Sequence, residues 1–173
     1  NLREIALPFM QALHEKIGEA INLGTRHDDE IVYLERTSSG RALVRVVYLV
    51  GGRAPLHLTS LGKLFLAADG PQKIREYARR TGLPGKTPHS LTTLAALEKE
   101  LDKVRRHGIA FDDEEAEMGL KCVAAPIHDD EGNVVAALSV SAPADRHDPQ
   151  WVMLVKQTAD AVSQALGHIA LKK

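Results

Sequence analysis

Three side chains that could do chemistry lie close together in the second half of the sequence, namely Cys122, Ser139 and Ser141. Cys122 is the only cysteine in the chain. A thiol can act as a nucleophile when a base is within reach, and a thiol beside hydroxyls can instead line a pocket for a small polar ligand. The two apolar runs that carry these residues flank His-Asp-Asp-Glu-Gly-Asn at 128–133, which is typical of a turn. The segment 119–143 therefore predicts a β-hairpin.

The predicted hairpin has one bulky apolar face and one face of small, weakly polar side chains, because successive residues of a strand point to opposite faces. A turn centred on residues 130–131 would place Cys122 opposite Ser139, and a turn centred on 131–132 would place it opposite Ser141. The small face could simply be exposed to solvent. Cysteine and alanine are usually buried, however, and a buried face of small residues leaves space for a small polar ligand.

Other candidate chemistry in the sequence has simpler interpretations. The acidic stretch 112–115 could supply general acid–base carboxylates, but a solvated loop with one buried member is the simpler interpretation. A nucleophilic Cys122 would need a base, and His128, expected on the same face of the hairpin, is several residues away. Residues 85–87 resemble the end of a phosphate-binding loop, but Arg80 stands where its first glycine is required. The eight histidines lack metal-ligand spacing, so neither a metal nor another cofactor is predicted.

Composition narrows the class of protein. A formal net charge of −1 argues against a basic nucleic-acid-binding surface, and 4% aromatic residues argue against a platform for stacking bases. No run approaches the roughly 18 apolar residues of a membrane span, and no signal peptide is recognisable. We therefore expect no membrane partner, and a single cysteine suits the reducing cytoplasm. The chain begins at Asn1 within a helical pattern, which indicates a piece of a longer protein.

Helices are expected at both ends of the chain. Apolar spacing predicts a helix over 2–17 that Gly18 ends, and Asp148-Pro149 is expected to begin a last helix that runs to about Ile169. Between them the patterns predict strands at 20–23, 31–36, 42–50 and 109–111, a helix from Thr59 or Ser60 to Gly70, a helix at 71–80 and a helix capped by Ser90 and stopped by Gly108. Antiparallel strands in succession with packed helices indicate one α+β domain.

The segment from Pro55 to Lys63 leads from a loop into a helix through a Thr or Ser cap. Unpaired backbone N–H groups and the positive end of the helix dipole make such a helix start suitable for binding an anion. An ordinary capped helix is the alternative interpretation.

Two longer stretches match a known family pattern. The first is GGRAPLHLTSLGKLFLA at 51–67, and the second runs from GIAFDDEE at 108–115 through GLKCVAAPI at 119–127 to AALSVSAP at 136–143. Their order, their spacing and the helices around them agree over nearly the whole chain. Together they resemble the C-terminal effector-binding domain of IclR-type transcription regulators.

The resemblance implies a GAF-like fold, with an antiparallel β-sheet flanked by α-helices, and a pocket for a small metabolite, often an organic acid. Residues 1–18 would be the end of a linker helix that leads from a missing N-terminal winged helix-turn-helix domain, and residues 19–173 would be the effector-binding domain. DNA would be bound only through the missing domain, by homodimers that are often paired into tetramers. No enzymatic activity is expected of such a domain.

Motif positions of the resembling family imply a set of pocket residues: Asp112, Cys122, Ser139, Ser141, Ser60, Leu61, Gly62, Leu43 and Val46. Relatives often carry a small residue where this chain has Leu61, so its side chain either narrows the cavity or turns into the core. Two alternatives to a ligand sensor remain open. One is a small hydrolase that uses Cys122, and the other is a module that only oligomerises.

A carboxylate ligand would have to be held by neutral donors. Lys121 should point away from the pocket face of the hairpin, which leaves the hydroxyls of Ser139 and Ser141 and the N–H groups at 60–62. Asp112 would repel a carboxylate unless it is protonated, so it more simply accepts a ligand hydroxyl or orients a serine.

Overall fold

The computed structural model describes residues 1–38 and 50–169. Within these ranges six strands form one antiparallel sheet in the order β3-β2-β1-β6-β5-β4. The elements, in chain order, are α1 (Leu2–Ile17), β1 (Ala20–His27), β2 (Glu30–Thr37), β3 (Arg53–Pro55), the 3-10 turn η2 (Leu56–Leu58), α2 (Ser60–Ala68), α3 (Pro71–Thr81), α4 (Leu94–His107), β4 (Ala110–Asp113), β5 (Leu120–His128), β6 (Val134–Pro143), the 3-10 turn η3 (Ala144–Arg146) and α5 (Trp151–Ala165). The expected α+β architecture is confirmed.

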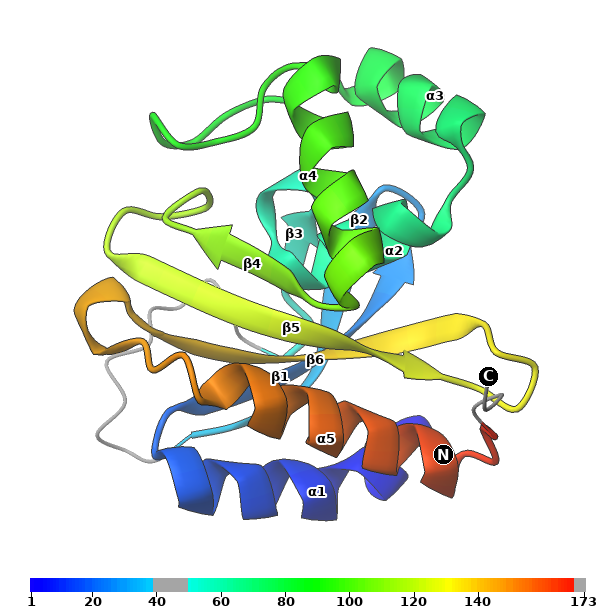
Figure 1. Cartoon of the computed structure of the whole chain (residues 1–173), viewed down its shortest axis with the longest axis vertical. Helices are drawn as coiled ribbons and strands as arrows, with labels where there is room; N and C mark the ends of the chain where they lie inside the picture. Colours follow the sequence, from blue (N-terminus) through cyan, green and yellow to red (C-terminus); the bar gives the residue numbers. More distant parts are fainter. Residues whose placement is uncertain (39–49, 170–173) are drawn as a thin grey trace.

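The two terminal helices, α1 and α5, cover one face of the sheet (Figure 1). Met10 and Leu13 of α1 and Val155 of α5 are buried against the bulky residues of β1, β5 and β6, as the apolar spacing predicts. Gly18 ends α1 in a left-handed conformation, with φ of 79°. The last helix is shorter than expected, and Ile169, expected to point inward, is 83% exposed because α5 ends at Ala165.

The helices α2, α3 and α4 lie on the opposite face of the sheet (Figure 1). Leu61 and Leu64 of α2 and Leu101 of α4 form a second core with Ala124 and Ala137, which belong to the small face of the hairpin. The small face is therefore buried, and the alternative of a solvent-exposed face is wrong. Helices thus cover both faces of the sheet, which keeps the small face of the hairpin away from bulk solvent.

The register of the β5–β6 hairpin sets the small face. Cys122 pairs with Ser141, which is the register expected from a turn centred on 131–132. A register shift between Ile127 and His128 then breaks the alternation. The His128 ring stacks on His168, beyond α5, with 5.0 Å between ring centroids. The expected place of His128 on the Cys122 face is therefore wrong.

Several boundaries differ from the sequence-based expectations. The strands β1 and β2 are longer than the predicted 20–23 and 31–36, and only Asp28 and Asp29 separate them. Asp28 has a positive φ of 55°. Helix α4 begins at Leu94 with Thr93 as its cap, because the Ser90 hydroxyl is engaged in the preceding loop. The strand expected at 42–50 lies outside the described residues apart from its last position. None of the helices within the described ranges is long and apolar enough to cross a bilayer.

Candidate functional site

A strip of polar side chains crosses four neighbouring strands on the sheet face that α2 covers. Asp112 on β4 pairs with Cys122 on β5, and Cys122 pairs with Ser141 on β6. Asn22 on β1 lies opposite Ser139 of β6. All five side chains belong to residues that are at most 3% exposed. Four of the residues that the sequence indicates as pocket-forming are thus brought together by strand register.

Asn22 connects the two serines of this strip. Its Nδ2 donates to Ser141 Oγ at 2.9 Å and to Ser139 Oγ at 3.2 Å. Ser141 Oγ also lies 3.2 Å from Cys122 Sγ, and either group can be the donor. The Asn22 Oδ1 atom is buried and has no hydrogen-bond partner within the described part of the chain. A buried amide oxygen without a partner is unfavourable, so it marks a position where a donor is missing.

The carboxyl group of Asp112 is held at one end of the strip. Its Oδ1 accepts the backbone N–H of Glu115 at 2.8 Å and that of Ala116 at 3.3 Å. Burial raises the pKa of Asp112 to about 7, and the nearby Glu115 carboxylate adds to the rise, while the N–H donors and the Lys63 cation oppose it. This carboxyl group can therefore change its protonation state near neutral pH.

Tyr33 on β2 also belongs to this face. The residue is 2% exposed, and burial together with the nearby Cys122 and Asp112 raises the pKa of its phenol. The phenol is therefore a neutral hydroxyl. Neither Tyr33 nor Asn22 was expected at the site. The one available sequence signal was the single polar Asn22 within the apolar start of its strand.

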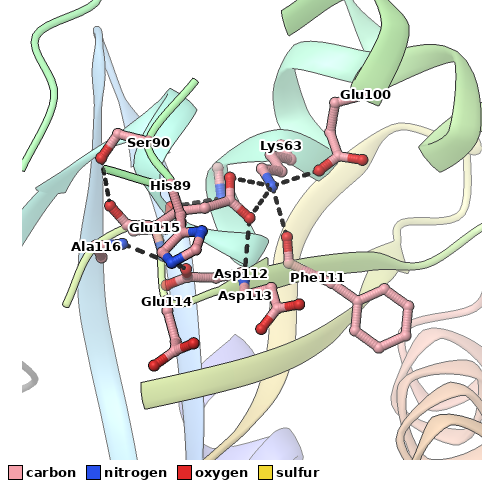
Figure 2. Close-up of polar contacts among 12 residues, drawn as sticks. Lys63, His89, Ser90, Glu100, Phe111, Asp112, Asp113, Glu114, Glu115 and Ala116 are labelled. Carbon is pink, nitrogen blue, oxygen red and sulfur yellow. Dashed lines mark hydrogen bonds and ion pairs between the residues drawn. The ribbon is translucent and has the colours of Figure 1, made fainter. Parts of the chain in front are cut away.

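A buried lysine on α2 anchors the loop that follows Asp112 (Figure 2). Lys63 is fully buried, and its Nζ donates to Glu115 at 2.8 Å, to Glu100 of α4 at 2.9 Å and to the Phe111 carbonyl oxygen at 2.6 Å. Three acceptors satisfy the three donors of an ammonium group. The cation is thus fully paired by acceptors of the protein itself.

The same loop is fixed by further hydrogen bonds, several of which are drawn in Figure 2. Glu115 Oε2 accepts the Asp113 N–H at 3.0 Å, and the Glu115 carbonyl accepts from the Ser90 hydroxyl at 2.6 Å. The expectation of one buried acidic residue at 112–115 is wrong, because Asp112 and Glu115 are 1% and 5% exposed. Lys63 permits the second buried carboxylate by neutralising it.

The start of α2 supplies three more of the predicted residues, Ser60, Leu61 and Gly62. Thr59 caps the helix, and its Oγ1 accepts the Gly62 N–H at 2.9 Å, so this donor is already used. The N–H groups of Ser60 and Leu61 precede the first intrahelical hydrogen bond of the helix. A Cβ atom on Gly62 would overlap the backbone of Leu56, which explains the glycine.

Leu61 turns into the core. It is 1% exposed, and its Cδ1 lies 3.0 Å from the position that a Cβ would take on Gly24, two residues beyond Asn22 on β1. The predicted wall residues Leu43 and Val46 lie outside the described residues. Among the described residues, no three His, Cys, Asp or Glu side chains are grouped closely enough to hold a metal ion. Ligand contact by the predicted pocket residues stays a prediction.

Sequence comparison identifies the relatives of this chain. The family model described as "Bacterial transcriptional regulator IclR C-terminal" matches residues 1–164. The HTH-type transcriptional repressor AllR of Escherichia coli K12 is 36% identical over 171 residues, which cover 96% of this chain and 63% of that repressor. The chain therefore spans less than two thirds of the length of this curated relative.

Solved structures share the fold. The IclR of Thermotoga maritima superposes with a TM-score of 0.89 at 31% identity, covering 97% of this chain and 69% of that chain. An IclR homolog from Microbacterium hydrocarbonoxydans, solved in complex with 4-hydroxybenzoate, has a TM-score of 0.89 at 30% identity and covers 95% of this chain and 68% of that chain. Because the family model spans nearly all of the sequence and the sheet with its two helical layers is shared, the chain belongs to the IclR family of bacterial transcriptional regulators, whose C-terminal domain it matches.

Proposed function

We propose that this domain binds a small organic acid at the polar strip of β4, β5, β6 and β1 and couples binding to operator recognition by an N-terminal DNA-binding domain. The main support for this proposal is that five polar side chains are buried on a sheet face that is otherwise apolar, namely Asp112, Cys122, Ser139, Ser141 and Asn22. Burial of polar groups is unfavourable unless they are paired, so a ligand that completes the pairing accounts for it. The complex of the Microbacterium homolog with 4-hydroxybenzoate, a carboxylate, supports the acid class.

Neutral donors would hold the carboxylate. The donors are the hydroxyls of Ser139 and Ser141, the N–H groups of Ser60 and Leu61, and Asp112 in its protonated form. Lys121 does not contribute, because its Nζ lies 5.6 Å from the centre of the Phe111 ring, a residue of the opposite core. This assignment is consistent with Lys63 being occupied by acceptors of the protein itself.

Residues 1–18 would form the end of the linker helix, and residues 19–173 the effector-binding domain. Ile21 and Leu23 flank Asn22 on β1 and pack in the same core as Met10 and Leu13 of α1. A shift of β1 on ligand binding would therefore reach α1. The ligand can alter DNA binding only if it favours one arrangement of the homodimer or tetramer, which would act on DNA in the cytoplasm.

Thermal melting against a panel of small acids tests this proposal. The panel contains glyoxylate, pyruvate, sugar acids and aromatic acids. An acid present at 100 times its Kd should stabilise the domain by about 2.7 kcal/mol and raise the Tm by several degrees. The shift should be lost in Ser139→Ala and Ser141→Ala but kept in Ser163→Ala, which removes a buried hydroxyl of α5. No shift from any acid would favour a module that only oligomerises.

Replacement of Cys122 by serine separates a sensor from a hydrolase. A sensor variant should fold, bind the same acid with changed affinity and leave it chemically intact, because a hydroxyl can take the place of the thiol beside Ser141. Ligand NMR over hours measures turnover by the wild-type domain. Consumption of the ligand that disappears in Cys122→Ser would instead support nucleophilic catalysis.

A further inference from the structure

We propose that Asn22 orients the hydroxyl groups of Ser139 and Ser141 as hydrogen-bond donors toward the ligand. The site therefore accepts anions, and it prefers acids that also carry a hydrogen-bond donor. This inference rests on the proposed function and deepens it. An amide nitrogen has two hydrogens to donate and accepts none. In Asn22 both are committed, one to Ser139 Oγ and one to Ser141 Oγ.

The hydrogen bonds from Asn22 leave the hydroxyl hydrogens of Ser139 and Ser141 free to donate to a ligand. A hydroxyl has one hydrogen and can accept through its lone pairs. Because each Oγ already accepts from Asn22, the hydroxyl hydrogens of Ser139 and Ser141 point elsewhere and remain available to a ligand acceptor. Ser141 keeps this freedom when Cys122, 3.2 Å away, donates its S–H to the hydroxyl oxygen. Asn22 is therefore a positioning residue that orients two donors toward an anion.

The second amide atom adds selectivity. Asn22 Oδ1 is buried and without a hydrogen-bond partner among residues 1–38 and 50–169. A ligand hydroxyl or amide N–H beside the carboxylate can supply the missing donor. A site that leaves a buried acceptor unpaired disfavours the analogue without the donor, and we expect a preference of about tenfold or more. The ligand class is thus a small hydroxy- or amido-substituted carboxylate.

Three matched pairs of acids test the ligand class, each differing by one hydroxyl: glycolate and acetate, lactate and propionate, and mandelate and phenylacetate. Calorimetric titration of the wild-type chain should show at least about tenfold tighter binding of the hydroxy acid in the pair that fits the site. Asn22→Leu, which has neither donor nor acceptor, should lose this preference. Equal affinity within a pair that binds would overturn the role of Oδ1.

Asn22→Asp tests the direction of the donors. An ionised carboxylate accepts from both serine hydroxyls, so they no longer face the ligand, and acid binding at pH 8 should weaken by about 100-fold or more. The loss relative to wild type should shrink at pH 5.5, where protonation restores a donor at position 22. Unchanged binding in the variant at pH 8 would overturn the proposal.

An NMR measurement on the unliganded chain tests the orientation of the Asn22 side-chain amide independently of acid binding. The side-chain NH2 signal of Asn22, assigned by its absence in Asn22→Asp, should show both protons protected from exchange. Ser139→Ala and Ser141→Ala should each shift one of the two protons. An NH2 signal indifferent to both substitutions would overturn the orientation of Asn22 even if acids bind. A second outcome separates the two proposals. If the NH2 signal behaves as expected but none of the six acids binds, the proposal that the site binds a carboxylate is wrong. The donation from Asn22 to the two serines would still stand.

Discussion

Replacement of Lys63 by methionine is expected to lower the free energy of unfolding by about 3–5 kcal/mol, because it removes one partner of a buried ion pair. The Glu115 side chain, only 6% exposed, would lose its cation, and so would the carbonyl oxygen of Phe111. Glu100, with 24% side-chain exposure, can turn toward water and should contribute less. Urea unfolding followed by circular dichroism measures the change.

A second substitution separates lost charge pairing from lost packing. Adding Glu115→Gln to Lys63→Met removes the unpaired buried charge, so the double variant should recover part of the lost stability. Lys103→Met, an exposed change on α4, is the matched control and should stay within about 0.5 kcal/mol of wild type. If Lys63→Met is as stable as Lys103→Met, the buried ion pair does not hold the loop. Because Glu115 donates its N–H to Asp112, the Lys63 variant should also bind acid more weakly.

Replacement of Asp112 by asparagine is expected to stabilise the unliganded domain at alkaline pH. Burial raises the pKa of this carboxyl group from 3.8 to about 7, so the folded state binds a proton that the unfolded state has already lost between those values. Stability from this group is fully present below about pH 4 and is lost as the pH rises through 7. At about 1.4 kcal/mol per pKa unit, the loss reaches at most about 4 kcal/mol above pH 8. Asparagine does not titrate, and its Oδ1 can still accept the N–H groups of Glu115 and Ala116.

The measurement is the difference in unfolding free energy between Asp112→Asn and wild type from pH 5 to pH 8. The difference should grow with pH in favour of the variant. Asp113→Asn, which changes the neighbouring exposed carboxylate, is the matched control measured over the same pH range. A constant difference for Asp112→Asn would contradict a raised pKa. The same shift predicts that binding of a carboxylate by wild type weakens above pH 7, as Asp112 ionises.

The hairpin and the terminal helices could be predicted because their signals are local. Alternating small and bulky residues indicated which face Cys122 occupies. The two turns that the sequence allowed left Ser139 or Ser141 as its partner, and the structure has Ser141. The small face was correctly favoured as buried, since cysteine and alanine seldom form a solvated surface. Four predicted pocket residues therefore lie in one strip for reasons that the sequence contains.

The other partners could not be predicted, because they come from distant segments. Asn22 is 117 residues from Ser139, and Lys63 is 52 residues from Glu115, and no periodicity in the sequence links such positions. Ser90 and Thr93 are both suitable caps by residue type. The tertiary bond from Ser90 to the Glu115 carbonyl decided that the helix would start later. A single bulge at His128 reversed the face of that residue.

Among residues 1–38 and 50–169, the strip consists of the neutral side chains of Asn22, Cys122, Ser139 and Ser141 and the carboxyl group of Asp112, so hydrogen bonds would dominate its contacts with a ligand. Attraction between exposed charges is screened within about 10 Å at 0.1 M salt, whereas hydrogen bonds in a buried site are screened far less. The affinity of regulators for DNA, by contrast, generally falls steeply with salt, because DNA binding releases counterions. A regulator with such a site would bind its metabolite with nearly constant affinity, while its affinity for DNA varies with the ionic strength of the cell.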